Sequence, residues 1–148
     1  MPNTPAMVGE GITAISPNDS VTKKMYDSAV KILNCFGKTE KISEHLMDAV
    51  VAVSGSSPAY VFILIESMAD AAVAEGMPRK QAYTFAAQAV LGSAKMVLDT
   101  NMHPGELKDR ICSPAGTTIK ARYVLEKNKF RNTIMQAMKA CADKAREL

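Results

Sequence analysis

One segment limits what this chain can fold into, because it is apolar on almost every side. Residues 60–74 read Tyr-Val-Phe-Ile-Leu-Ile-Glu-Ser-Met-Ala-Asp-Ala-Ala-Val-Ala. A helix without a polar face must be covered on most sides. In a bundle this small the simplest cover is a second copy of the chain, and the alternative is a central helix within one monomeric bundle. We expect the second copy, since nearby small residues allow close helix packing: Ala69, Ala71, Ala72, Ala86, Ala87, Ala89 and Gly92.

The chain from Ser43 onward has the apolar spacing and the start and stop signals of helices. Ser43 is a candidate cap for the first, the run from Ser54 to Pro58 interrupts the helical pattern, and Gly76 with Pro78 separates two longer helices. The predicted helices cover residues 43–53, 59–75, 78–99, a short turn after 104, 119–126 and 130–146.

The opening residues follow a different pattern. Residues 11–16 alternate β-branched side chains and end at a Pro-Asn turn, and residues 38–42 form a second short strand. Between them, Asp19 or Ser20 caps a helix that runs to about Phe36 and stops at Gly37. Strand, helix and strand are typical of an α/β sheet, but two strands are too few for a sheet domain. These opening residues therefore look like the C-terminal end of a larger α/β domain.

Composition excludes several classes of protein. The chain has no tryptophan, ten methionines and many alanines, which favours packed helices over a β-sandwich. The net charge of +3 is spread among acidic residues without a basic block, so no nucleic-acid partner is expected. The start lacks the features of a signal peptide, and the longest apolar run, Ala59 to Ile65, is too short to span a membrane. The sequence predicts a soluble protein.

Three widely spaced cysteines, Cys35, Cys112 and Cys141, form no CxxC pair. They suit reduced thiols in the cytoplasm rather than disulfides or a zinc site, and no metal site is expected. Neither histidine forms a recognisable catalytic arrangement with Cys112, so we expect a packing role for this thiol.

The segment Ser113-Pro114-Ala115-Gly116-Thr117-Thr118 places three hydroxyls directly before a helical run. Unpaired N–H groups and partial positive charge at a helix N-terminus stabilise a carboxylate or phosphate. The alternative is a simple helix start, capped by Ser113 with Pro114 in the first turn, and the local pattern alone favours it.

Several motifs in order resemble the pyrroline-5-carboxylate reductases, NAD(P)H-dependent enzymes of the last step of proline synthesis. The resemblance covers almost the whole chain. The matching segments are 1–6 with 8–11, 48–50 with 54–60, 76–79, 87–88, 92, 94–96, 103–109 and 113–119. It implies a mainly α fold: a helical dimerisation domain at 43–148, a bundle of the 6-phosphogluconate dehydrogenase C-terminal type, preceded by a β-α-β remnant of a nucleotide-binding Rossmann domain at 1–42.

The resemblance also implies site residues and partners. The loop of Ser113, Pro114, Ala115, Gly116, Thr117 and Thr118 would hold the substrate carboxylate. Thr118 would lie near the ring nitrogen as the catalytic hydroxyl, relaying a proton from water, and Thr117 would act through its backbone. Glu44 would lie near the substrate amine, or be simply an acidic residue in a first helical turn. The family's interleaved helices imply a homodimer, and larger rings of dimers occur.

Departures from the family pattern concern the loop and the cofactor. Ala115 stands where a glycine is usual, which suits the loop only if its φ is negative. Ser57 also replaces a common glycine. Arg110 is a weak indication of a phosphate and hence of NADPH rather than NADH. Asn3, Thr4 and Pro5 match the cofactor edge.

The chain contains no Gly-x-Gly-x-x-Gly turn of the kind that binds a dinucleotide. We therefore expect a C-terminal piece of a reductase that is inactive alone. The alternative is a non-catalytic, all-helical dimerisation module.

Overall fold

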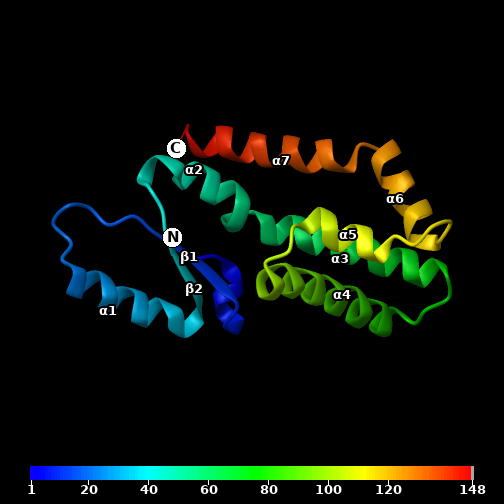
Figure 1. Ribbon diagram of the computed structural model, residues 1–148, viewed down its shortest axis with the longest axis horizontal. Coiled ribbons are helices and arrows are strands. Elements are labelled where there is room, and N and C mark those ends of the chain that lie inside the picture. Colours follow the sequence, from blue (N-terminus) through cyan, green and yellow to red (C-terminus); the bar gives the residue numbers. More distant parts are fainter. Residues whose placement is uncertain (148) are drawn as a thin grey trace. The chain divides into compact units, whose positions relative to one another are not determined.

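The computed structural model describes residues 1–147 and is mainly helical, with one small sheet (Figure 1). The longer elements are β1 (Gly11–Ile15), α1 (Lys23–Leu33), β2 (Gly37–Lys41), α2 (Met47–Val50), α3 (Ser57–Ala74), α4 (Arg79–Thr100), α5 (Pro104–Ile111), α6 (Thr117–Lys127) and α7 (Phe130–Ala145). Short 3₁₀ turns cover Thr4–Val8, Asn34–Phe36 and Glu44–Leu46, and a π turn covers Val51–Gly55. The expected β-α-β start followed by helices is confirmed.

The chain divides into two compact units. Unit 1 contains residues 1–60 and the chain from 135 onward, and unit 2 contains residues 61–134. The predicted domain boundary between residues 42 and 43 is a different division and stays a prediction.

In unit 1, β1 and β2 form a parallel pair in which Gly11 lies opposite Gly37 and Ile15 opposite Lys41. The strands approach closely at the glycines: a Cβ on Gly37, which has a φ of 148°, would lie 1.9 Å from the Gly11 carbonyl oxygen. Only glycine fits there. β-Branched residues fill β1, and Thr13 and Ala14 are its buried side chains.

The start of α1 differs from the prediction. Thr22, rather than Asp19 or Ser20, is the cap, since its hydroxyl oxygen accepts the Met25 N–H at 3.3 Å. Ser20 instead donates its N–H to the Asn18 side chain at 3.1 Å, within the preceding turn. The α-helix itself ends at Leu33, and a 3₁₀ turn continues the helical run to Phe36, where the prediction ended it.

The predicted interruption of the helical pattern is present as a π turn: regular α-helix ends at Val50, the π turn covers Val51–Gly55, and α3 begins at Ser57 after Ser56. The Ser56 N–H bonds to the Val51 carbonyl at 2.8 Å, and the Ser57 hydroxyl donates to the Val53 carbonyl at 2.8 Å. These bonds occupy carbonyls around the irregular turn. Pro58 falls in the first turn of α3, where a missing N–H costs nothing. Ser43 makes no side-chain cap bond at the start of this helical stretch.

The buried apolar side chains of the described residues are few, and all but Val50 and Leu107 are alanines: Ala14, Ala52, Ala69, Ala82 and Ala86. Large apolar side chains remain exposed, including Phe62 and Ile63 on α3, which are 62% and 63% exposed. The chain exposes 11019 Å², whereas two separate compact domains of half its mass would expose about 8,900 Å². The described chain therefore leaves large apolar side chains of α3 uncovered.

One helical stretch in the described residues, Glu44–Ala74, is long and apolar enough to cross a membrane, judged by length and composition only. Its mean hydropathy is 1.6 over the tested window. The same property fits a core helix whose cover is another protein chain.

Candidate functional site

The loop between α5 and α6 in unit 2 is a tight turn. The Gly116 N–H bonds to the Ser113 carbonyl oxygen at 3.1 Å. Pro114 and Ala115 are the two central residues, and Ala115 has a φ of 58°. A proline followed by a positive φ is the type II arrangement, whose third position favours glycine. The condition under which alanine suits this position, a negative φ, is therefore not met, and the turn forms with an alanine in a left-handed conformation.

The start of α6 carries no side-chain cap. Its first residue is Thr117, and Gly116 is the cap residue, with no side-chain hydrogen bond. The interpretation of Ser113 as the cap with Pro114 in the first turn is wrong. The helix begins at Thr117, three residues later than that interpretation requires. A Cβ on Gly116 would lie 2.3 Å from Ser113 Oγ, so the serine hydroxyl lies against the glycine, beside the helix start. The N–H groups at the start of α6 are open to an anionic ligand.

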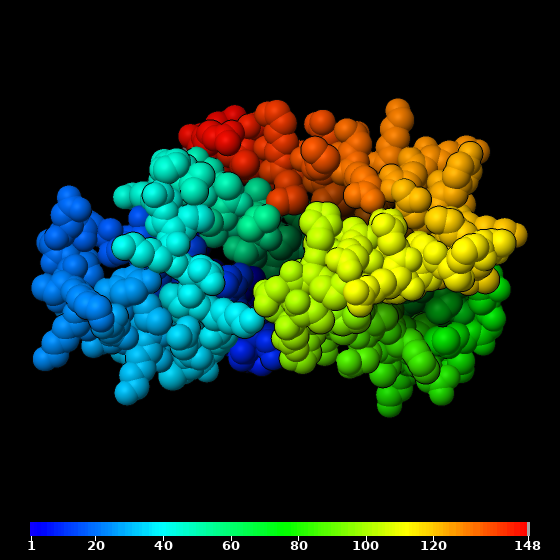
Figure 2. Space-filling view, viewed as in Figure 1, coloured from blue at the N-terminus to red at the C-terminus, as the bar shows by residue number. Residues whose placement is uncertain are grey.

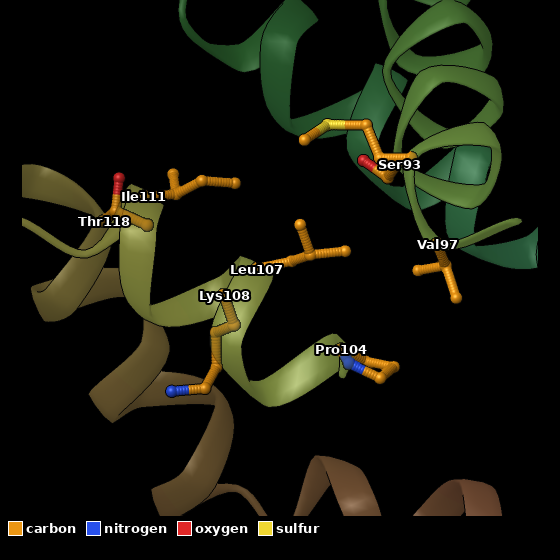
Figure 3. Close-up of a pocket in the computed structure, with 8 residues that line it drawn as sticks. Ser93, Val97, Pro104, Leu107, Lys108, Ile111 and Thr118 are labelled. Atoms are coloured by element: carbon orange, nitrogen blue, oxygen red, sulfur yellow. The ribbon is translucent and has the colours of Figure 1, made fainter. Parts of the chain in front are cut away.

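Thr118 lines two cavities of unit 2, and Lys108 lines both as well. The first cavity has a volume of about 330 Å³ and lies between α4, α5 and the start of α6 (Figure 3). Its walls are mostly apolar, with Leu107 of α5 extending toward α4 and the Thr118 hydroxyl at the far side. Its lining residues are Ser93, Met96, Val97, Pro104, Leu107, Lys108, Ile111 and Thr118.

The second cavity has a volume of about 360 Å³ and is lined from α5, the loop, α6 and the start of α7. Lys108, Arg122 and Arg131 face Glu126 in this group. Arg131 donates to the Glu126 carboxylate at 2.9 Å, which lowers the pKa of Glu126, with a smaller contribution from Arg122. The ion pair with Lys108 likewise lowers the pKa of Asp109. The cations beside Thr118 are therefore paired with carboxylates that they keep ionised.

The predicted substrate contact Glu44 belongs to unit 1. It is exposed and lines a cavity of about 410 Å³ with Ser16, Lys41 and Ser43, where β1 and β2 end. The carboxyl ends of parallel strands are the usual ligand-binding edge of an α/β sheet. Its role near the substrate amine stays a prediction.

Two of the predicted cofactor residues, Asn3 and Arg110, make hydrogen bonds to other residues of this chain. Asn3 accepts the Ile12 N–H at 2.9 Å and donates to the Ser54 carbonyl at 3.0 Å. Thr4 and Pro5 begin the first 3₁₀ turn. Arg110, in unit 2, pairs with Glu106 at 3.0 Å. In these described residues Asn3 therefore ties β1 to the π turn, and its predicted contact with a cofactor stays a prediction.

Sequence reasoning missed the charged side chains around the second cavity. The sequence pattern includes Lys108 only within a motif and predicts no role for Arg122. The spacing of Arg122 and Glu126, one helical turn apart, is a signal that could have drawn attention to α6. Their meeting with Lys108 and Arg131 depends on the loop and on the start of α7, which no local pattern specifies.

The three cysteines are free thiols in this structure, and no cluster of potential metal ligands occurs among residues 1–147. Cys112 is half-buried, lines the second cavity and directly precedes the loop. Residues near 104–118, coloured yellow in Figure 2, lie at the surface of the face drawn there. This part of unit 2 is therefore accessible from that side.

A mainly helical chain with a large uncovered apolar surface, following a small parallel sheet, has the features of a helical domain that associates with another protein chain. Residues 44–148 match the family model described as pyrroline-5-carboxylate reductase dimerisation. The chain belongs to the pyrroline-5-carboxylate reductase family.

Named relatives agree with this assignment. The chain is 57% identical to pyrroline-5-carboxylate reductase of Escherichia coli K12 and 48% identical to that of Methanosarcina acetivorans, in each case over all of this chain and 55% of the relative. The chain thus spans about half the length of the curated relatives it matches. The Plasmodium falciparum pyrroline carboxylate reductase structure with NADP bound is 40% identical, with a TM-score of 0.89 over 97% of this chain and 59% of that one. The Coxiella burnetii structure is 35% identical, with a TM-score of 0.94 over 99% of this chain and 55% of that one.

Proposed function

We propose that the protein containing this chain reduces 1-pyrroline-5-carboxylate to L-proline, the last step of proline synthesis. One observation carries the proposal: the start of α6 has no side-chain cap, the Ser113 hydroxyl lies beside it, and Thr118 is in its first turn. A carboxylate at this position receives N–H donors and the positive end of the helix.

The residues of this chain would bind and orient the substrate. The N–H groups at the start of α6 and the Ser113 hydroxyl hold the carboxylate, and Gly116 keeps that hydroxyl beside the helix. The Thr118 hydroxyl faces the ring nitrogen and relays a proton from water, since a threonine is too weak an acid to supply one alone. Glu44 is the proposed contact to the amine. Substrate approach is favoured by the positive charge of Lys108, Arg122 and Arg131.

A nicotinamide cofactor, NADPH or NADH, would supply the hydride. The described residues alone do not fit it: Asn3 uses its amide within unit 1, Arg110 pairs with Glu106, and the chain has no Gly-x-Gly-x-x-Gly turn. A nucleotide-binding region outside these 148 residues is therefore part of the proposal.

The proposed partner is a second copy of the chain, and larger assemblies of dimers are compatible with it. The exposed apolar side chains of α3 support this, as does the description of the matching family model. Neither a nucleic acid nor a membrane is proposed as a partner. A cytoplasmic location is proposed from the free cysteines.

The test uses the two adjacent threonines as a matched pair in the full-length protein. Thr118→Ala should lower kcat for reduction of pyrroline-5-carboxylate by about a hundredfold, because it removes the proton relay. Thr117→Ala should change kcat only a few-fold, since its backbone makes the proposed contact. NAD(P)H oxidation measures both.

Equal kinetics for wild type and Thr118→Ala would remove Thr118 from the mechanism. If the full-length wild-type protein fails to oxidise NAD(P)H with this substrate, the reductase proposal is wrong. The chain would then be a dimerisation module without catalysis, which the uncovered apolar surface also favours.

A further inference from the structure

Asn3 connects three segments of unit 1 through hydrogen bonds. Its side-chain oxygen accepts the Ile12 N–H of β1 at 2.9 Å, and its side-chain amide donates to the Ser54 carbonyl of the π turn at 3.0 Å. Its backbone carbonyl accepts the Ala6 N–H at 3.1 Å, at the start of the 3₁₀ turn Thr4–Val8. The half-buried Asn3 side chain therefore has both of its polar atoms bonded within the chain.

The Ser54 carbonyl needs a donor because a proline lies four residues later. In a continuous helical backbone this carbonyl would accept the N–H of residue 58, and Pro58 has no N–H. The proline itself is tolerated in the first turn of α3, so the carbonyl is the group that lacks its helical donor. An acceptor without a donor in a partly buried position destabilises the fold. The Asn3 amide supplies this donor from 51 residues earlier in the chain.

The residues that directly follow Asn3 are the predicted cofactor edge, Thr4 and Pro5. They belong to a single 3₁₀ turn that has no buried side chain, so packing contributes little to its position. Asn3 precedes this turn as its cap residue but makes no side-chain bond to it. The Asn3 side chain instead fixes the start of the turn to β1 and to the π turn.

We propose that Asn3 is a positioning residue and not a direct contact of the cofactor. Its amide replaces the N–H that Pro58 lacks and thereby orders the turn of Thr4 and Pro5 before a nicotinamide cofactor binds. The part that concerns the cofactor rests on the proposed function. A turn that is ordered in advance binds its ligand without the entropy cost of ordering it, so Asn3 contributes to cofactor affinity through the turn.

The first experiment is a double-mutant cycle of urea unfolding in the full-length protein without cofactor. Asn3→Ala should raise the unfolding equilibrium constant about tenfold, because the Ser54 carbonyl and the Ile12 N–H lose their partner. The Pro58→Ala background supplies an N–H to the same carbonyl, so there Asn3→Ala should raise the constant only about threefold. The control Thr22→Ala removes the cap of α1 in the same unit and should have equal effects in the two backgrounds.

A second variant tests the contact with the carbonyl by its pH dependence. Asn3→Asp keeps an acceptor for the Ile12 N–H but places a carboxylate oxygen against the Ser54 carbonyl. This repulsion should raise the pKa of the new carboxyl above its value in the unfolded chain. The variant should therefore be less stable than the wild type at neutral pH, and the difference should shrink as the pH falls toward about 4, where the protonated carboxyl donates to the carbonyl.

The positioning role is tested by binding of NADPH and NADH to the full-length protein, measured by the fluorescence of the reduced nicotinamide. Asn3→Ala should raise the dissociation constant at least about fivefold, since the turn must then be ordered on binding. Thr22→Ala, with a similar loss of stability, should leave the dissociation constant as in the wild type. This difference separates positioning from a general effect on the fold.

Three results would overturn the proposal. Equal effects of Asn3→Ala with and without Pro58→Ala mean that the amide does not replace the N–H of residue 58. Unchanged stability of Asn3→Ala without cofactor means that the side chain is free to contact the cofactor directly. An unchanged dissociation constant in Asn3→Ala means a structural role only. A wild type that binds NADPH or NADH but does not reduce pyrroline-5-carboxylate contradicts the reductase proposal and leaves this one standing.

Discussion

Ala115 is one of three non-glycine residues among the described residues that have a positive φ, with Asn101 and Lys129. Its φ of 58° places it in the left-handed region, in the centre of the proposed substrate loop. Strained backbone is often retained where a functional loop requires it. The loop keeps its turn hydrogen bond between Gly116 and Ser113 in spite of this cost.

Ala115→Gly should stabilise the protein by about 0.5 to 1 kcal/mol, because removing the left-handed penalty outweighs the greater freedom of glycine in the unfolded chain. Urea unfolding measures the change. The control Ala89→Gly, within α4, should instead destabilise by about 1 kcal/mol. A loss of similar size at both positions would contradict the strained conformation at Ala115.

At the scale of the element, α5 depends on a cap that the sequence did not suggest. The Nδ1 atom of His103 accepts the Gly105 N–H at 3.0 Å, and Pro104 occupies the first helical position. The sequence predicts only a short turn after residue 104, whereas the capped α5 has two turns. Lys108 of this helix lines both cavities.

His103→Ala should destabilise the protein by about 1 kcal/mol through the lost cap. His103→Asn should recover most of this, since asparagine is a preferred cap residue. Thermal unfolding of the three proteins checks the order. If alanine and asparagine behave alike, the cap does not contribute to stability.

At the scale of the whole molecule, the described chain leaves most of its large apolar side chains without cover. Burial of such surface is the main favourable contribution to folding, so a stable protein must cover it. In the homodimer proposed above, the apolar side chains of one copy are covered by those of the second copy.

Light scattering should therefore give a dimeric or larger mass in the absence of detergent. Ile63→Arg places a charge on the exposed apolar side of α3 and should lower the mass toward the monomer or cause aggregation. The control Lys24→Glu, on the exposed surface of α1, should keep the wild-type mass. A monomeric wild type would contradict the proposed homodimer. A wild-type protein that stays in solution only with detergent would favour a membrane as the partner.

Local patterns in the sequence were enough to predict most elements. Apolar periodicity, glycine stops and β-branched runs predicted β1, β2 and the longer helices to within a few residues, because these signals act over one or two turns. The same kind of signal located the interruption near residues 54–58 without predicting its π-turn form, and it failed at residues 113–116, where the turn displaces the helix start to Thr117.

By itself, the sequence determined the order of elements, the need for a partner along α3 and the motifs that place the chain in its family, since each of these depends on residue identity and spacing. Only the tertiary structure decided the left-handed φ of Ala115, the uncapped start of α6 and the convergence of Lys108, Arg122 and Arg131 on one cavity. These depend on how α5, α6 and α7 pack around a short loop. Contacts of that kind join residues that no local pattern brings together.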